Sequence, residues 1–290
     1  MTRVACIGEA MIELSMRGST ANVGVAGDTL NTAIYLKRAA PDLQVDYVTC
    51  LGDDPFSGQI RDFIAAQDIG CGAIQTIAGK SPGLYAITTT DDGERSFTYW
   101  RSTSAAREMF QTGDTCDFSP LSDYDLVYLS GITMAILPPH VRQALIRWLE
   151  SASIRVAYDS NYRPKLWEDQ QIAQDATQAM WARCDIPMPS IDDEMALFGE
   201  TDTQVAARFD TYQGTGALKR GDLGPVSLGE PVEQAYDAAP KVVDTTAAGD
   251  SFNGGYLGAV LTGSTQADAL RAGHDCAARV VQHRGAIIPK

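Results

Sequence analysis

Residues 126–198 alternate between short apolar β-rich runs and longer segments with helical periodicity, and this alternation limits the possible folds more than any other feature. The pattern predicts strands at 126–129, 155–158 and 186–188, and helices at 138–151, 170–183 and 192–198. Strands that alternate with helices form parallel sheets, because each helix carries the chain back across one face. We therefore expect an α/β fold with a doubly wound, mainly parallel sheet flanked by helices. Ligands bind such sheets beyond the carboxyl ends of the strands.

At 290 residues the chain could form one large α/β domain or two small ones, and 44% hydrophobic residues are enough for a sizeable core. We expect a single domain over residues 1–290. The net charge of −14 argues against nucleic acid or an anionic membrane surface as a partner. An apolar strand is expected at residues 4–7, with no basic leader before it, and no stretch approaches the length of a membrane span. These features favour a cytoplasmic protein.

The cysteines and histidines carry no pattern of a disulfide framework or a metal site. Scattered single cysteines in apolar runs favour buried reduced thiols over disulfides in a chain of this size. The three histidines lack metal-ligand spacing. The six cysteines are Cys6, Cys50, Cys71, Cys116, Cys184 and Cys276.

Residues 241–256 read as a strand, a turn of small residues and a helix that opens on a carboxylate. Small side chains at Ala247, Ala248 and Gly249 let backbone N–H groups approach a ligand, and the first N–H groups of a helix attract anions. Asp250 at the start of that helix can accept the proton of an attacking hydroxyl. On local grounds an ordinary helix N-cap explains Asp250 equally well.

The string Asp-Thr-Thr-Ala-Ala-Gly-Asp-Ser-Phe at 244–252 resembles the second signature of the ribokinase-like (PfkB) carbohydrate kinases. The resemblance implies a ribokinase-like fold, ATP and Mg²⁺ as cofactors, and Asp250 as the catalytic base. It also implies an anion hole at Ala247, Ala248 and Gly249, the last two of which contact the nucleotide. Ala247 stands where many members of the family carry glycine.

Residues 27–33 resemble the first signature of the same family, in which Gly27, Asp28 and Asn31 bind sugar hydroxyls. A glycine turn with an aspartate N-cap is an equally good local explanation of Gly27 and Asp28. Two signatures in the family's order are more specific than either alone.

Two β-rich runs, residues 83–90 and 94–100, are joined by Asp91-Asp92-Gly93 and predict a hairpin. The resemblance implies that about residues 10–26 and 74–104 form a small β lid, which expels water from the site. In the family such a hairpin carries sugar-binding residues, here Tyr85 and Tyr99. An apolar lid surface would favour a homodimer in which two lids pair.

The choice of substrate depends on arginine. Arg101, followed by Ser-Thr-Ser-Ala-Ala, resembles a segment of the 2-keto-3-deoxygluconate kinases. On local evidence alone, Tyr99 and Arg101 could equally be ordinary exposed side chains of a strand. Arg163 lies in a segment, 159–167, similar to both those kinases and fructose kinases. Because a guanidinium binds a carboxylate through two hydrogen bonds, Arg101 and Arg163 together would select an acid sugar. We expect ATP-dependent phosphorylation of the 6-hydroxyl of 2-keto-3-deoxygluconate, with fructokinase or another neutral-sugar kinase as the alternative.

The nucleotide and the metal are expected beside two further segments. Lys219, Gly221 and Gly224 match the family's K-x-G-x-x-G segment over the nucleotide, although a glycine-rich β turn explains the string locally. Glu194 matches the glutamate of the family's N-x-x-E motif, which holds Mg²⁺ through water, while Ile191 replaces its asparagine. An acidic helix N-terminus is the rival explanation of Glu194.

Two other classes of function remain open at this stage. A dinucleotide-dependent oxidoreductase would use the same kind of sheet, but no G-x-G-x-x-G follows a predicted strand. A catalytically silent sugar-binding regulator would not need the carboxylate of Asp250.

Overall fold

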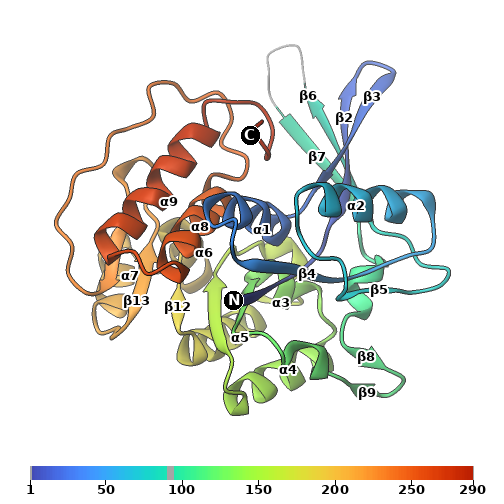
Figure 1. Cartoon of the computed structure of the whole chain (residues 1–290), viewed down its shortest axis with the longest axis horizontal. Helices are drawn as coiled ribbons and strands as arrows, with labels where there is room; N and C mark the ends of the chain where they lie inside the picture. The colour runs from blue at the N-terminus through green and yellow to red at the C-terminus, as the bar shows by residue number, and fades with distance from the viewer. Residues whose placement is uncertain (1, 90–94, 290) are drawn as a thin grey trace.

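The computed structural model describes residues 2–89 and 95–289, and its centre is a parallel sheet of six strands (Figure 1). The order across the sheet is β12-β11-β10-β1-β4-β5, so the chain extends to one side of β1 and later returns to build the other. A chain that reverses in this way leaves a crevice at the carboxyl edge. The strands are β1 (Arg3–Ile7), β4 (Gln44–Leu51), β5 (Ile74–Thr76), β10 (Leu126–Ser130), β11 (Arg155–Asp159) and β12 (Ile186–Pro187).

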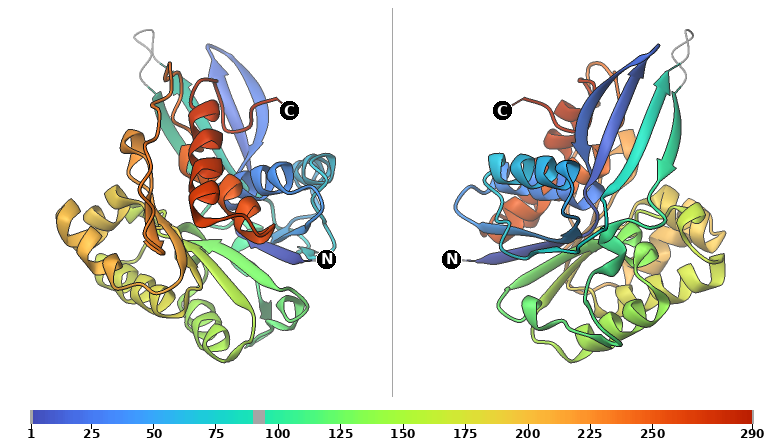
Figure 2. Two further views of the ribbon diagram at one scale, coloured as in Figure 1. Left: turned by 60° about the vertical axis from the view of Figure 1, so that its left-hand side comes forward. Right: turned by 90° about the vertical axis from the view of Figure 1, so that its right-hand side faces the viewer.

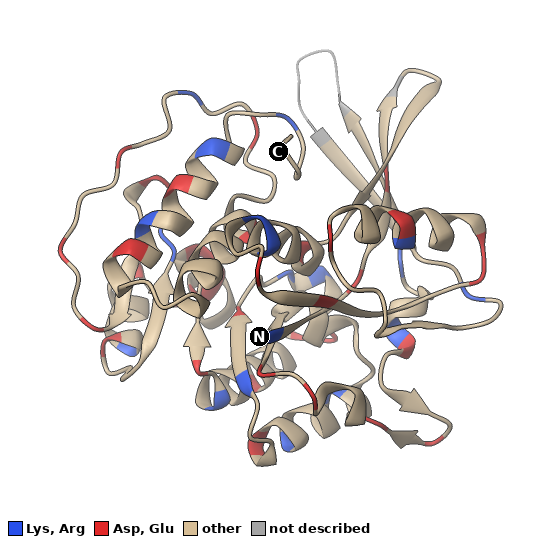
Figure 3. Cartoon of the chain, in the orientation of Figure 1, with Lys and Arg blue, Asp and Glu red and all other residues tan. Residues whose placement is uncertain are grey.

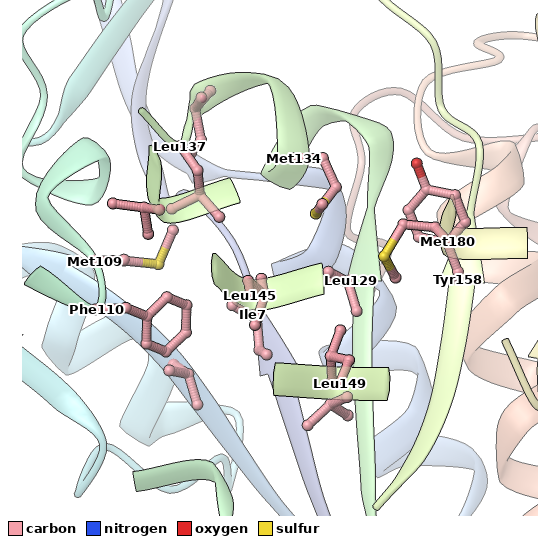
Figure 4. Close-up of a cluster of buried hydrophobic side chains, with 14 of the residues drawn as sticks. Ile7, Met109, Phe110, Leu129, Met134, Leu137, Leu145, Leu149, Tyr158 and Met180 are labelled. Carbon is pink, nitrogen blue, oxygen red and sulfur yellow. The ribbon is translucent and has the colours of Figure 1, made fainter. Parts of the chain in front are cut away.

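The central strands are apolar on both faces because helices cover both sides of the sheet. Along β1, Val4 and Cys6 pack into one core cluster and Ala5 and Ile7 into the other. Figure 4 shows the second cluster, in which Leu145 and Leu149 of one covering helix lie against Ile7 and Leu129. The predicted doubly wound α/β architecture is confirmed.

Helices α3, α4 and α5 cover the face that carries Ile7, and α1, α2, α8 and α9 contribute to the core on the opposite face. Several helices begin at caps that the sequence supplies: Asp54, for example, accepts hydrogen bonds from the first backbone N–H groups of α2 and precedes a proline. The helices are α1 (Asp28–Ala39), α2 (Pro55–Ala66), α3 (Gly131–Ile136), α4 (Pro139–Ser151), α5 (Gln170–Arg183), α6 (Ile191–Phe198), α7 (Asp202–Asp210), α8 (Ala248–Leu261) and α9 (Gln266–Val280).

A second sheet of four strands projects from the main body (Figures 1 and 2), and we call it the lid sheet. It has the order β3-β2-β6-β7, and it consists of β2 (Met11–Arg17), β3 (Thr20–Ala26), β6 (Gly83–Thr89) and β7 (Arg95–Trp100). β5 pairs with β4 in the main sheet, so the second part of the lid sheet starts at Gly83 rather than near residue 74. The predicted Asp91-Asp92-Gly93 turn lies outside the described residues, while the antiparallel pairing of β6 with β7 agrees with the predicted hairpin.

The remaining strands of the described residues form two small antiparallel sheets. These are β8 (Gln111–Thr112) with β9 (Thr115–Cys116), and β13 (Thr215–Leu218) with β14 (Val226–Gly229). A single parallel bridge between Ser190 and Lys219 places the end of β13 beside the carboxyl edge of the main sheet.

The strand predicted just before Asp244 does not form. Val242 and Val243 are 62% and 37% exposed, and the N–H groups of Val243 and Asp244 donate to the carbonyl of Val281 after α9. Their β-branched side chains favour a strand, but this segment bonds to a helix end instead of to a neighbouring strand.

All six cysteines are free. Within the described residues, the helices are too short or too polar to cross a membrane. Figure 3 shows basic and acidic residues interspersed along α9 and α2 rather than gathered by sign.

Candidate active site

A cleft of about 1170 Å³ lies between the lid sheet and the carboxyl edge of the main sheet. The lid sheet contributes Met11, Tyr85, Phe97 and Tyr99, all on the same face because strand side chains alternate. Asp159, the last residue of β11, lines the cleft on the side of the main sheet. The cleft therefore lies where the topology of the sheet predicts a ligand site.

The chain enters α8 through a left-handed residue, Ala247, with φ 60° and ψ 19°. The amide of Ala248 donates to the carbonyl of Thr245, so it is used within the turn. Gly249 and Asp250 have no acceptor for their backbone N–H groups among the described residues. Two donors at the positive end of a fourteen-residue helix form an anion site that opens into the cleft.

Asp250 lies in the first turn of α8, where Asn31 Nδ2 donates a hydrogen bond of 2.8 Å to its Oδ2. The two helices approach closely because Gly254 faces α1: a Cβ there would lie 2.5 Å from Cβ of Tyr35 and 2.8 Å from the carbonyl of Thr32. Thr32 Oγ1 donates to the carbonyl of Asp250 at 3.1 Å. Helix packing therefore brings residues of the two signature segments together.

The surroundings of Asp250 favour its protonated form. Burial raises the pKa of Asp250 well above its usual range, and the charges of Asp28 and Asp159 raise it further. The hydrogen bond from Asn31 and the charge of Lys219 act in the opposite direction. A carboxylate with a raised pKa is a stronger base, which suits proton abstraction from an alcohol.

Asp28 lines the cleft, and two side-chain donors hold its carboxylate. Ser130 Oγ donates to Asp28 Oδ2 at 2.5 Å, and Asn161 Nδ2 donates to the same oxygen at 2.9 Å. Burial raises the pKa of Asp28, while the hydrogen bond from Ser130 lowers it. Gly27 also lines the cleft, so the structure gathers Gly27, Asp28 and Asn31 as the sequence predicts.

Lys219 reaches the cleft as a buried cation next to the amino end of α8. Its Nζ lies 2.7 Å from Asp159 Oδ2 and 3.1 Å from Asn253 Oδ1. A Cβ at Gly249 would lie 3.7 Å from the same nitrogen. Lys219 therefore adds positive charge beside the anion site, through its side chain and not only through its backbone.

The sequence did not single out Asn253 or Tyr128, which complete this arrangement. Asn253 Nδ2 donates to Asp159 Oδ2 at 2.6 Å and to the hydroxyl of Tyr128 at 3.1 Å. Asn253 is one helical turn beyond Asp250, so its spacing in the helix is the only local signal that could have indicated it.

Both arginines expected to bind a sugar carboxylate line the cleft, and each is paired with a protein carboxylate. Arg101 forms a buried ion pair with Glu9, and Arg163 Nη1 lies 3.1 Å from Asp193 Oδ1. The side chain of Arg163 is 53% exposed, so it is the more accessible of the two. The structure places Arg101 and Arg163 in one cleft. From the sequence this shared location was only an expectation.

On the lid sheet, Tyr85 donates a short hydrogen bond to Glu13, whose other oxygen accepts one of 3.0 Å from Ser15. Tyr99 stacks on Tyr85 with ring centroids 5.5 Å apart. These contacts fix an aromatic wall on the lid-sheet side of the cleft. The sequence pointed to Tyr85 and Tyr99 but not to the role of Glu13 in holding Tyr85.

Gly221 and Gly224 both adopt positive φ, 59° and 74°, in the loop after Lys219. Gly221 lines the cleft, whereas Gly224 packs against the ring of Tyr236, so a Cβ there would lie 2.5 Å from Cδ2 of that ring. Gly224 therefore shapes the loop from behind. Beyond it the cleft has an apolar end, lined by Val242, Phe252, His274, Ala277, Ala278 and Val281.

Glu194, expected to hold Mg²⁺ through water, does not line the cleft. It is fully buried on α6, where Arg208 Nη2 donates to it at 2.8 Å, and burial raises its pKa to about 7. Consecutive helical residues point about 100° apart, so Asp192 and Asp193 face the cleft instead. Glu194 therefore lies away from the cleft in which the metal was expected, and its two neighbours on the same helix line that cleft.

The described residues contain no group of three or more His, Cys, Asp or Glu side chains with metal-binding geometry. A site that holds Mg²⁺ mainly through its waters and a substrate's phosphates needs only one or two carboxylates, which Asp192 and Asp193 supply. The residues present fit that kind of site.

Comparison with known proteins agrees with this geometry. The pattern of the pfkB family carbohydrate kinases matches residues 1–290. The 2-dehydro-3-deoxygluconokinase of Escherichia coli (strain K12) is 41% identical over 303 residues, covering 99% of this chain and 97% of that protein. The enzyme of the same name from Dickeya dadantii (strain 3937) is 42% identical over 301 residues, covering 99% and 96%. By contrast, probable fructokinase-4 of Arabidopsis thaliana is 26% identical, covering 90% and 82%.

Solved structures have the same fold. A PfkB protein from Polaromonas sp. JS666 superposes with a TM-score of 0.82 at 26% identity, covering 97% of this chain and 96% of that one. Aminoimidazole riboside kinase from Salmonella enterica, solved with aminoimidazole riboside and an ATP analog, gives 0.79 at 22% identity, covering 98% and 95%.

Proposed function

The chain belongs to the pfkB family of carbohydrate kinases, and on that premise we propose that it transfers the γ-phosphoryl group of ATP to the 6-hydroxyl of 2-keto-3-deoxygluconate, also named 2-dehydro-3-deoxygluconate. The relatives that bear this enzyme's name are far more similar to the chain than the fructokinase is. The observation that carries the proposal is the meeting of Asp250 and the free amides of α8 in a cleft that Arg101 and Arg163 also line.

The acid sugar occupies the side of the cleft beneath the lid sheet. Asp28 and Asn31 receive its hydroxyls, and the aromatic wall of Tyr85 and Tyr99 covers it. Arg101 and Arg163 receive its carboxylate, since a guanidinium matches a carboxylate with two parallel hydrogen bonds. This leaves the far hydroxyl of the sugar next to Asp250.

The nucleotide occupies the other side, with its base toward the apolar end near Phe252 and Val281 and its phosphates toward α8. Mg²⁺, when bound with ATP, neutralises phosphate charge, and Asp192 and Asp193 are the residues that would hold its waters. Lys219 and the N–H groups of Gly249 and Asp250 stabilise the negative charge that develops on the transferred group.

Asp250 takes the proton of the 6-hydroxyl as that oxygen attacks the γ-phosphorus. The bond from phosphorus to the bridging oxygen of ATP breaks, ADP leaves, and the product is 2-keto-3-deoxy-6-phosphogluconate. The lid sheet excludes water, so that the phosphoryl group passes to the sugar instead of to water.

The test is an ADP-release assay with ATP across 2-keto-3-deoxygluconate, gluconate and fructose. We expect turnover with the keto-deoxy acid and a loss of that activity in Arg101→Met, with little change for any neutral sugar accepted. Preferred turnover of fructose by the native enzyme, unaffected by Arg101→Met, would support a neutral-sugar kinase instead.

We further propose that the protein acts in the cytoplasm as a dimer through the lid sheets. Val23 and Trp100 are 47% and 58% exposed on the lid sheet, an unusual exposure for such side chains. Sedimentation analysis should give a dimer for the native chain and a monomer for Trp100→Glu. A native monomer at micromolar concentration would contradict this arrangement.

A further inference from the structure

Glu9 lies at the base of the lid sheet, where the chain passes between the lid sheet and the body. It lies two residues before the start of β2, while Gly27 follows β3, Gly83 begins β6 and Arg101 follows β7. A Cβ at Gly27 would lie 2.3 Å from the carbonyl of Glu9, and a Cβ at Gly83 would lie 2.6 Å from Glu9 Oε1. The four points at which the chain passes between the lid sheet and the main body therefore lie around Glu9.

The carboxylate of Glu9 forms its ion pair with Arg101 almost without solvent. The side chains are 1% and 9% exposed, respectively. Neither carboxylate oxygen of Glu9 has a hydrogen-bond partner of good geometry among the described residues, and the same holds for Nε and Nη2 of Arg101. Charge, more than directed hydrogen bonding, holds the pair together.

The two members of the pair differ in their access to the ligand. Arg101 lines the cleft beside Tyr99, whereas Glu9 lies behind it and does not line the cleft. A ligand carboxylate can therefore reach the guanidinium but not Glu9. Once bound, it shares Arg101 with a carboxylate that the protein already provides.

We propose that Glu9 is a positioning residue that limits how tightly Arg101 holds a sugar carboxylate. This inference rests on the proposed acid-sugar function. A desolvated guanidinium without a counter-ion would attract any carboxylate strongly, and substrate and product carry the same carboxylate. Glu9 offsets that charge and orients the guanidinium, so that the phosphorylated product can leave.

The substitution Glu9→Gln separates charge from shape. Glutamine has nearly the same size and retains an oxygen on the side of Arg101, but it removes the negative charge. Glu9→Asp keeps the charge and withdraws it from the guanidinium by one methylene. If Glu9 limits binding through charge, acid-sugar affinity rises in the order native, Glu9→Asp, Glu9→Gln.

The experiment is calorimetric titration of the native protein and both variants with 2-keto-3-deoxygluconate, and with fructose as the uncharged control. We expect Glu9→Gln to bind the acid sugar about tenfold more tightly, with a smaller gain for Glu9→Asp and no gain for fructose. The kcat of Glu9→Gln should fall while the KM for the acid sugar also falls, because tighter product binding slows release.

Unchanged or weaker acid-sugar binding in both variants would overturn the inference, and so would equal changes for both sugars, which a purely structural role predicts. If Glu9→Gln does not fold, as judged by thermal melting, the comparison of Glu9→Asp with the native protein decides the question. If the native protein binds fructose but not the acid sugar, the proposed function fails and this inference fails with it. Native binding of the acid sugar without the expected order overturns only the role of Glu9.

Discussion

Asn31 Nδ2 donates a 2.8 Å hydrogen bond to Asp250 Oδ2 across a sequence separation of 219 residues. The contact joins the first turn of α1 to the first turn of α8, and so it joins the sugar side of the cleft to the anion site. Asn31 also orients the oxygen that must face the substrate hydroxyl. This contact sets the geometry from which most of the chemistry follows.

Asp250→Asn should lower kcat by about 10²–10⁴, because the amide cannot accept the proton of the attacking hydroxyl. The affinity for ATP should change little, since the backbone N–H groups of α8 remain. Steady-state kinetics and nucleotide titration measure the two effects separately. Asp175→Asn, on the outer surface of α5, is the matched control and should behave like the native protein. Near-normal turnover of Asp250→Asn would show that Asp250 is not the catalytic base.

Asn31→Ala should move the acid limb of the pH profile to higher pH. The hydrogen bond from Asn31 lowers the pKa of Asp250, so its loss raises a pKa that burial already holds above the usual range. The base must be deprotonated, so activity falls as pH decreases through that pKa, and the fall begins at higher pH in the variant. The measurement is log kcat/KM against pH, and an unchanged limb would show that Asp250 does not produce it.

Lys219→Met should damage both stability and nucleotide use. It leaves the carboxylate of Asp159, 2% exposed, without its cation, and loss of one partner from a buried pair costs roughly 3–5 kcal/mol. The KM for ATP should rise, because the positive charge beside Gly249 is lost. The double variant Lys219→Met with Asp159→Asn should recover stability but not the affinity for ATP. Recovery of both would mean that Lys219 acts only through Asp159.

Gly254→Ala should push α8 away from α1. The added methyl would lie 2.7 Å from the backbone nitrogen of Leu36 and 2.8 Å from the carbonyl of Thr32, and backbone atoms cannot rotate away. Overpacking of this kind costs about 1–3 kcal/mol. Separation of the helices should also lengthen the contact between Asn31 and Asp250, and kcat should fall.

Gly58→Ala is the control for that change, because Gly58 is also helical but a Cβ there would have no atom within 4 Å. Alanine is the better helix former by about 0.5–1 kcal/mol, so this variant should be slightly more stable than the native chain. Urea unfolding of both variants, together with their kcat values, completes the comparison. Equal stabilities would rule out the helix contact as the cause.

Much of the site could be predicted because its chemistry is local. The turn before α8, with its small residues and Asp250, is continuous in sequence, and so is the segment that contains Gly27, Asp28 and Asn31. The sequence could not place Glu194, because a motif counted along the chain does not say which side of a short helix faces the cleft. The helical repeat and the partner Arg208 decide that, and they leave Asp193 in the cleft.

The sequence by itself determined the alternation of strands and helices, the caps, and the two segments that meet in the cleft at Asn31 and Asp250. These follow from side-chain size, periodicity and backbone preference within a few residues. Only the tertiary structure decided that Arg101 is paired with Glu9, that Lys219 reaches Asp159, and that Val242 and Val243 form no strand. Those outcomes depend on which groups, distant in the sequence, come into contact when the sheet assembles. No single stretch of chain determines the charge, the desolvation and the backbone partners at each of these contacts.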